Sequence, residues 1–164
     1  CFNDVTHDKY GNVYVGDTYT DRIYRTNQFG QLPMWLYSPN LAPNGIHIDD
    51  ESGIMIVGSW GAVMEGWGTP ELSGDLKSID IHTKKIKTIS KTIGNLDGVE
   101  SNGKGSYSVT DWSSGKLYNI KKNGRFEELK TLGKGAADHE VILDKNLILI
   151  PVMTEGKVVA LKID

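Results

Sequence analysis

The stretch Asn95-Leu-Asp97-Gly-Val-Glu100 decides the fold, together with the β-forming run from 106 to 120 that follows it. It predicts an acidic residue, Asp97, held on a tight Gly turn, and then two strands, 106–111 and 116–120, joined by a polar turn. A similar motif occurs three more times, at 2–5, 43–46 and 137–140, and an apolar strand follows each copy. Each copy places a carboxamide or a carboxylate at the same point of the repeat.

The repeats start at four equivalent residues, Asn3, Asn44, Asp97 and Asp138, which lie 41, 53 and 41 residues apart. A period near 40 residues made of short β-rich runs is typical of propeller blades with four strands each. The sequence therefore predicts a single all-β domain over residues 1–164, a β-propeller with repeat units at about 2–37, 43–91, 96–132 and 136–164.

The fourth unit stops at Asp164 without an outer strand, so we expect four consecutive blades of which the last is incomplete. Such a chain is interpreted as part of a longer propeller. Further blades, or self-association, are expected to cover the exposed flanks of its first and last blades.

The composition limits the partners and the compartment. With 38% hydrophobic residues and no apolar run of roughly 18 to 20, we expect a soluble protein without a membrane partner. A net charge of −3 with both signs mixed argues against nucleic acid, and the basic run at 84–91 is interpreted as the solvated face of an outer strand. Cys1 is the single cysteine, so neither an intrachain disulfide nor a Cys-based zinc site is expected. The cytoplasm and a periplasmic or secreted location both stay open.

Propeller geometry brings the repeat-start residues together. The start of strand one and the loop between strands two and three open at the same end of a blade, so Asn3, Asn44, Asp97 and Asp138 should converge on one mouth of the channel. Their oxygens form the ligand set of a hard divalent cation, Ca²⁺ before Mg²⁺, with Zn²⁺ or Mn²⁺ also tolerated. The alternative is a row of polar residues that bind blade backbones and trapped water.

Aromatic residues follow the second strands at the same end. The long loop at 60–74 contains Trp60, Met64 and Trp67, and it is interpreted either as a flap over a small-molecule pocket or as a loop packed on the neighbouring blade. Trp112 is a candidate for the pocket wall, and His139 for substrate contact or proton transfer.

These motifs resemble the six-bladed propellers of the regucalcin and gluconolactonase family, which includes senescence marker protein and related lactonases and organophosphatases. The resemblance rests on the Asn-Asp motif at 3–4, Pro-Asn-Gly at 43–45 and Asp-Gly at 97–98, and it covers the whole chain in register. It implies a six-bladed ring with a divalent cation at the channel mouth. Asn44 and Asp97 would be metal ligands, Asp97 also the general base or nucleophile, and Asn3 a ligand or substrate contact. The family's Glu ligand from its first blade has no counterpart here.

Two functions follow from these residues. The first is a metal-dependent hydrolase of the lactonase type, acting on a lactone or related ester, with Asp97 as its catalytic residue. The second is a non-catalytic propeller that binds a small ligand or a protein at the same mouth, because one fold supports many functions. A purely structural repeat array is a third interpretation.

Overall fold

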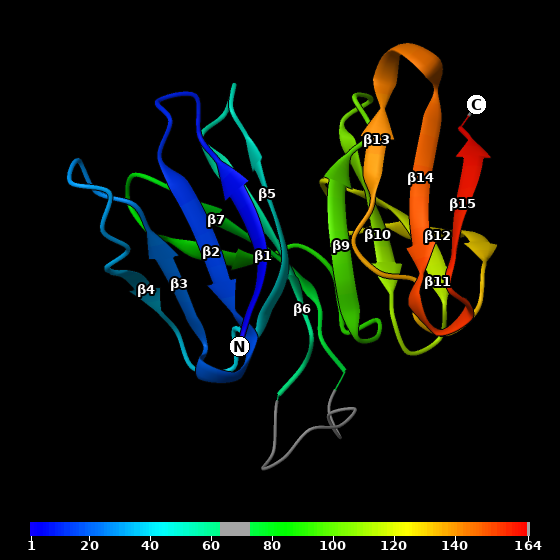
Figure 1. Cartoon of the computed structure of the whole chain (residues 1–164), viewed down its shortest axis with the longest axis horizontal. Helices are drawn as coiled ribbons and strands as arrows, with labels where there is room; N and C mark the ends of the chain where they lie inside the picture. Colours follow the sequence, from blue (N-terminus) through cyan, green and yellow to red (C-terminus); the bar gives the residue numbers. More distant parts are fainter. Residues whose placement is uncertain (63–72, 164) are drawn as a thin grey trace.

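The computed structural model describes residues 1–62 and 73–163, and it shows four antiparallel sheets in chain order (Figure 1). The first three sheets have four strands each and the fourth has three, as the all-β propeller prediction requires. The strands are β1 (Phe2–His7), β2 (Val13–Asp17), β3 (Arg22–Arg25), β4 (Met34–Tyr37), β5 (Pro43–Asp49), β6 (Ile54–Ser59), β7 (Leu76–Asp80), β8 (Ile86–Thr88), β9 (Leu96–Ser101), β10 (Ser106–Asp111), β11 (Lys116–Lys121), β12 (Phe126–Thr131), β13 (Glu140–Ile142), β14 (Leu147–Val152) and β15 (Lys157–Lys162).

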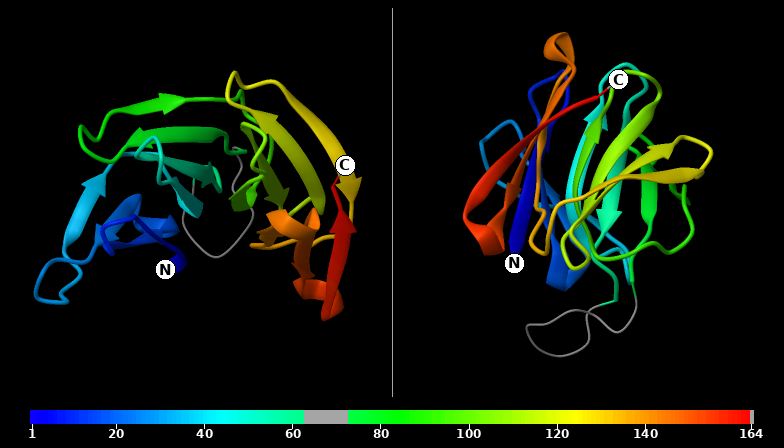
Figure 2. Two further views of the ribbon diagram at one scale, coloured as in Figure 1. Left: turned by 90° about the horizontal axis from the view of Figure 1, so that it is seen from above. Right: turned by 90° about the vertical axis from the view of Figure 1, so that its right-hand side faces the viewer.

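The four sheets, which we call blades 1 to 4, follow one another around an arc (Figure 2). The first strand of each blade lies on the inner side of this arc and the last strand on its outer side. Three short 3-10 turns are the only helical elements in the described residues. None of the helical segments there is long or apolar enough to cross a lipid bilayer.

Burial follows the radial order of the strands. Every residue of β10 is buried, including its Ser and Thr residues, because both faces of a second strand pack against neighbouring blades. In β12 the first residue is half-buried and the other five are exposed, and charged side chains protect this outer edge. In this blade the second strand is therefore fully buried and the fourth strand forms the polar outer edge.

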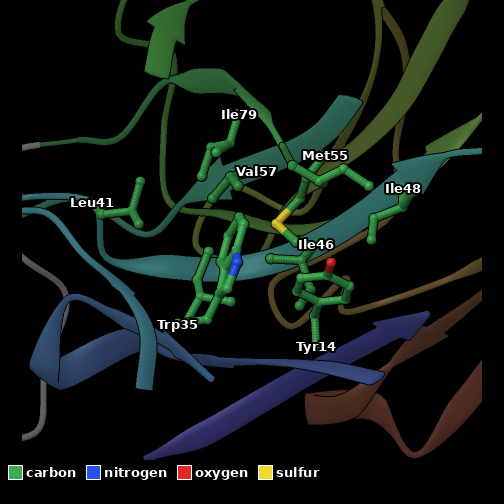
Figure 3. Close-up of a cluster of buried hydrophobic side chains, with 10 residues drawn as sticks. Tyr14, Trp35, Leu41, Ile46, Ile48, Met55, Val57 and Ile79 are labelled. Atoms are coloured by element: carbon green, nitrogen blue, oxygen red, sulfur yellow. The ribbon is translucent and has the colours of Figure 1, made fainter. Parts of the chain in front are cut away.

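Hydrophobic side chains fill the space between successive blades. Between blades 1 and 2, Tyr14 and Trp35 meet edge to face with 5.2 Å between ring centroids, and they pack with Met55 and its neighbours (Figure 3). Similar clusters join blade 2 to blade 3 and blade 3 to blade 4. The blades are therefore held together mainly by apolar contact.

The repeat-start motifs lie inside strands, so the expected tight Gly turn is wrong. Asn44 and Gly45 belong to β5, and Asp97 and Gly98 belong to β9. Neither glycine has a positive φ angle. Instead, the pairing register shifts next to Asn3, Asn44 and Asp97, as it does at a β-bulge. A bulge changes the direction of a side chain, so a polar residue within an extended inner strand can point toward the neighbouring blade.

The glycines are required by the close approach of the next blade. A Cβ atom on Gly45 would lie 1.8 Å from the backbone oxygen of Asp97, and one on Gly98 would lie 2.7 Å from the Cα atom of Asp138. Backbone atoms cannot move aside as the end of a side chain can. The inner strands of blades 2 and 3, and the segment just before β13 in blade 4, therefore meet backbone to backbone at this end.

We expect Gly45→Ala to lower the free energy of unfolding by about 3 kcal/mol or more, because overpacking against backbone forces the strands apart. The matched control is Gly16→Ala in blade 1, where a Cβ atom would lie 3.1 Å from the nearest atom, the oxygen of Pro43. Its cost should stay below about 1 kcal/mol. Urea unfolding with linear extrapolation measures both. Equal costs for the two substitutions would contradict this account of Gly45.

Candidate channel-mouth site

The predicted site residues lie at one end of the blades, which we call the site end and define as the end where β1, β5 and β9 begin. Asn3, Asn44 and Asp97 lie in these inner strands, and Asp138 lies two residues before β13. The second strands finish at the same end, since Pro43 pairs with Ser59 and Leu96 with Asp111. The loops between second and third strands therefore start at the site end.

Hydrogen bonds connect three of these residues across three blades. The Asn3 Nδ2 atom donates to Asn44 Oδ1. The Asn44 Nδ2 atom in turn donates to the backbone oxygen of Leu96 at 3.1 Å and to Asp97 Oδ2 at 3.2 Å. Asn44 is buried, with 2% of its surface exposed. It is therefore fixed with its nitrogen toward Asp97 and its oxygen toward blade 1.

Asp97 is a half-buried carboxyl group with a high proton affinity. Burial, and then the negative charge of Asp138, raise its pKa to about 7, while the hydrogen bond from Asn44 opposes the rise. Asp138 is exposed to solvent, but loss of part of its water still raises its own pKa. The charge of Asp138 thus acts on Asp97 from the adjacent blade.

Asp4 is a third carboxyl group at the site end, and it is not among the site residues predicted from the sequence. Burial, followed by the charge of Asp138, raises its pKa to about 7. Its Oδ2 atom accepts the backbone N–H of Ile46 at 2.6 Å, so it joins blade 1 to blade 2. Its place directly after Asn3, equivalent to Gly45 in the next repeat, was the signal that could have found it.

The acidic groups have no basic partner. Among the described residues, Asp4, Asp97 and Asp138 form no ion pair with Lys or Arg. The segment 63–72, which the structure does not describe, contains no Lys or Arg. The site end therefore carries negative charge that only protons or a bound cation can neutralise.

A His–Glu pair lies farther along the same inner strands and was also missed. His47 Nδ1 is 3.0 Å from Glu100 Oε2, and both side chains are half-buried. Desolvation lowers the pKa of His47, but the hydrogen bond and charge of Glu100 outweigh it and the net pKa is raised. Each residue stands three positions after a repeat-start residue, which is the pattern that could have revealed the pair.

His139 is buried, with 5% of its surface exposed. Its Nε2 atom lies 2.6 Å from Ser108 Oγ, and its Nδ1 atom has no partner in the described part of the chain. Burial, followed by the nearby charge of His47, lowers its pKa to about 4, so its ring is neutral at pH 7. Direct contact with a substrate would require exposure that His139 does not have here.

Two of the predicted aromatic residues meet at the site end. The rings of Trp60 and Trp112 are 6.0 Å apart at 63°, and both residues are half-buried. The Trp60 backbone accepts a hydrogen bond from Asn95 at 2.8 Å, which ties the start of the long loop to blade 3. The other two predicted substrate contacts, Met64 and Trp67, lie outside the described residues.

The predicted cation ligands can be tested against this arrangement. Carboxylate oxygens suit a hard cation. However, Asn44 turns its nitrogen toward Asp97, so these two side chains do not offer oxygens to one point. Within residues 1–62 and 73–163, no group of three or more His, Cys, Asp or Glu side chains is placed to hold a metal ion. As placed, the four predicted ligands do not form a chelating site, and we derive no chemical step through a metal.

Comparisons with known proteins show the fold. No protein-family model and no curated protein matches the chain. Solved structures do match: virginiamycin B lyase from Staphylococcus aureus has a TM-score of 0.65 at 16% identity, covering 99% of this chain and 55% of that one. Another match is a streptogramin B lyase with a TM-score of 0.69 at 13% identity, covering 99% of this chain and 54% of that one.

An auxiliary nutrient binding protein from Bacteroides thetaiotaomicron matches as well, with a TM-score of 0.73 at 14% identity, covering 98% of this chain and 38% of that one. This chain therefore spans about half, or less, of the length of these structures. They are β-propellers, and at such identities they support that fold and no particular activity. The regucalcin-like family and the six-bladed ring stay predictions.

The raised pKa of Asp97 predicts how stability depends on pH. The folded chain binds this proton more tightly than the unfolded chain, so the contribution of Asp97 to stability is fully present below about pH 4 and is lost as the pH rises through about 7. In EDTA, we expect the thermal midpoint of the wild type to fall by several degrees, relative to that of Asp97→Asn, between pH 5 and pH 8.

The quantity to measure is the difference in thermal midpoint between the wild type and Asp97→Asn. His139 has a lowered pKa, so below about pH 6.5 it makes both proteins more stable as the pH rises, and the difference cancels this effect. Asp144→Asn, at an exposed position in blade 4, serves as the control and should follow the wild type. Parallel curves for wild type and Asp97→Asn would show that Asp97 does not titrate in this range.

Proposed function

We propose that the site end is the active site of a hydrolase that opens a lactone or related ester, with Asp97 transferring the proton. The observation that carries this proposal is the grouping of Asp97 with two other carboxyl groups that have no basic partner. A carboxyl group with a pKa near 7 suits both the taking and the giving of a proton at neutral pH. Such perturbed groups concentrate at functional sites.

The reaction would use residues of this chain as follows. Ionised Asp97 takes a proton from water as the water oxygen attacks the ester carbonyl carbon. The bond between that carbon and the leaving oxygen then breaks, and Asp97 returns the proton to the leaving oxygen. The Asn44 amide group holds Asp97 in place, and the Trp60–Trp112 pair supplies an apolar wall. The lyases on this fold support the idea that such a propeller can carry catalysis, and one of them is a catalytically inactive histidine-to-alanine variant solved with quinupristin.

Asp97→Asn should lower kcat by about 100-fold or more, since general acid–base catalysis contributes at least that much. The assay is acid release from a panel of lactones and aryl esters in a pH-stat. Asp144→Asn is the control and should keep the wild-type rate. Because the substitution removes a buried charge, Asp97→Asn should unfold at an equal or higher temperature than the wild type. Full activity in folded Asp97→Asn would refute the role of Asp97.

A divalent cation also stays a proposal. The uncompensated charge of Asp97 and Asp138 attracts Ca²⁺, but few oxygens face one point, so we expect weak binding. The thermal midpoint should rise with Ca²⁺ only at millimolar concentrations, and Asp97→Asn should abolish the rise. A rise of the same size in the variant would place the ion elsewhere. A large rise at micromolar Ca²⁺ would mean that Asn44 turns to form a complete site.

The second candidate is a non-catalytic propeller that binds a small ligand. The Trp60–Trp112 pair favours it, and so does the nutrient binding protein that shares the fold. Tryptophan fluorescence distinguishes the two functions. A compound that changes this fluorescence and is recovered unaltered after long incubation would favour binding over hydrolysis.

A further inference from the structure

A cavity of about 520 Å³ lies between blades 2 and 3, and the function proposed above does not use it. It reaches the end of the blades opposite the site end, since its wall includes Asp80 at the end of β7 and Tyr107 near the start of β10. We call it the blade 2–3 cavity. Its lining combines lysines, hydroxyl groups and apolar side chains.

Three lysines, Lys85, Lys87 and Lys122, line the blade 2–3 cavity, against one carboxylate, Asp80. Asp80 is already engaged, because it accepts the backbone N–H groups of His82 and Thr83 at 2.9 Å each. Lys122 has a loose ion pair with Asp49 at 3.5 Å. The ammonium groups of Lys85 and Lys87 form no ion pair with the described residues. The cavity therefore carries net positive charge in a protein that is acidic overall.

Tyr107 provides a hydrogen-bonding group in the wall of the cavity. Its side chain lines the cavity, yet only 3% of the residue is exposed. No hydrogen bond of its hydroxyl group is found within the described part of the chain. The hydroxyl oxygen is also not one of the enclosed unpaired polar atoms of the described residues, so it faces the cavity and is available to a ligand oxygen.

The walls of the cavity are fixed before any ligand arrives. The turn between β11 and β12 packs so tightly on blade 2 that a Cβ atom on Gly124 would lie 2.0 Å from the backbone oxygen of Ile89. Ile54 and Ile56 add an apolar surface beneath the lysines. Because the backbone of the walls is already in place, binding has to order mainly the exposed side chains of Lys85, Lys87 and Lys122.

We propose that the blade 2–3 cavity binds a small acidic sugar through its anionic group, which is a carboxylate or a phosphate. The lysine ammonium groups donate charge-assisted hydrogen bonds to the anion. Tyr107 and the hydroxyl groups of Ser78, Thr83 and Thr88 pair with the sugar hydroxyls, and the isoleucines cover its ring. The basic run at 84–91, which the sequence analysis interpreted as a solvated face, thus provides part of a ligand site.

The test is isothermal titration calorimetry at fixed ionic strength with glucuronate, glucose 6-phosphate and neutral glucose. We expect one of the two anions to bind. Glucose should bind at least about tenfold more weakly, because it lacks the charged contact with the lysines; tenfold in affinity corresponds to about 1.4 kcal/mol of binding free energy. Whichever anion binds identifies the group as carboxylate or phosphate. The proposal would be overturned if neither anion binds when it is present at about 20-fold the protein concentration and the amide NMR shifts also stay unchanged at about 10 mM ligand.

Two variants and a matched control locate the binding. Lys85→Ala with Lys87→Ala should weaken binding about tenfold or more, and Tyr107→Phe should weaken it severalfold while keeping the volume of the side chain. The control is Lys9→Ala with Lys145→Ala, which removes the same charge at exposed positions on blades 1 and 4. Equal weakening in the control would mean general charge attraction and would also overturn the proposal. Because neither variant touches Asp97, this outcome is independent of the hydrolase activity.

Discussion

The close approach of the inner strands is the constraint on which the rest of the structure depends. Gly45 faces the backbone of Asp97 and Gly98 faces Asp138, at distances that leave no room for a side chain. This approach brings polar residues of adjacent blades within hydrogen-bonding and electrostatic range. It also removes much of the water around the carboxyl groups, and their raised pKa values follow from that loss. Packing and chemistry at the site end therefore have one origin.

Asp4 shows the same constraint with a different residue. In blade 1 the position of Gly45 and Gly98 is occupied by an aspartate, and its carboxylate reaches the backbone N–H of Ile46 in the next blade. Where glycine permits direct backbone contact, Asp4 bridges the space instead. Its burial is unfavourable for the ionised form, so the negative charge of Asp4 at the site end costs stability whenever the carboxyl group is ionised. A propeller that needed only stability would gain from a neutral residue here, so the charge is consistent with a functional site.

Much of the fold could be predicted from the sequence, because the repeat is read from residues that each blade contains. The continuous apolar character of strands such as β14 and the charged outer strand β12 indicate the radial order directly. The convergence of Asn3, Asn44 and Asp97 follows from that order. The direction of the Asn44 amide group does not, because it depends on a hydrogen bond to Leu96 in another blade. For the same reason the sequence cannot show that the Asn44 nitrogen, and not its oxygen, faces Asp97.

The reason for the glycines also lay beyond the sequence. An Asn-Gly or Asp-Gly pair predicts a turn by its local preference. Here the preference is overridden by contact between blades, which no local pattern describes. His47 with Glu100, and Tyr107 with its cavity, were missed on the same grounds, since each lies where two blades meet. Sequence periodicity describes one blade well and the space between two blades poorly.

The two ends of the blades differ in charge, and this limits what each can bind. At the site end, Asp4, Asp97 and Asp138 repel anions and favour a neutral ester or a cation. At the opposite end, Lys85, Lys87 and Lys122 favour an anion. An acidic sugar would therefore be excluded from the first site by the same charges that keep the pKa of Asp97 near 7. If hydrolysis of a lactone at the site end releases a hydroxy acid, that product has the charge and the hydroxyl groups of the ligand that we propose for the blade 2–3 cavity.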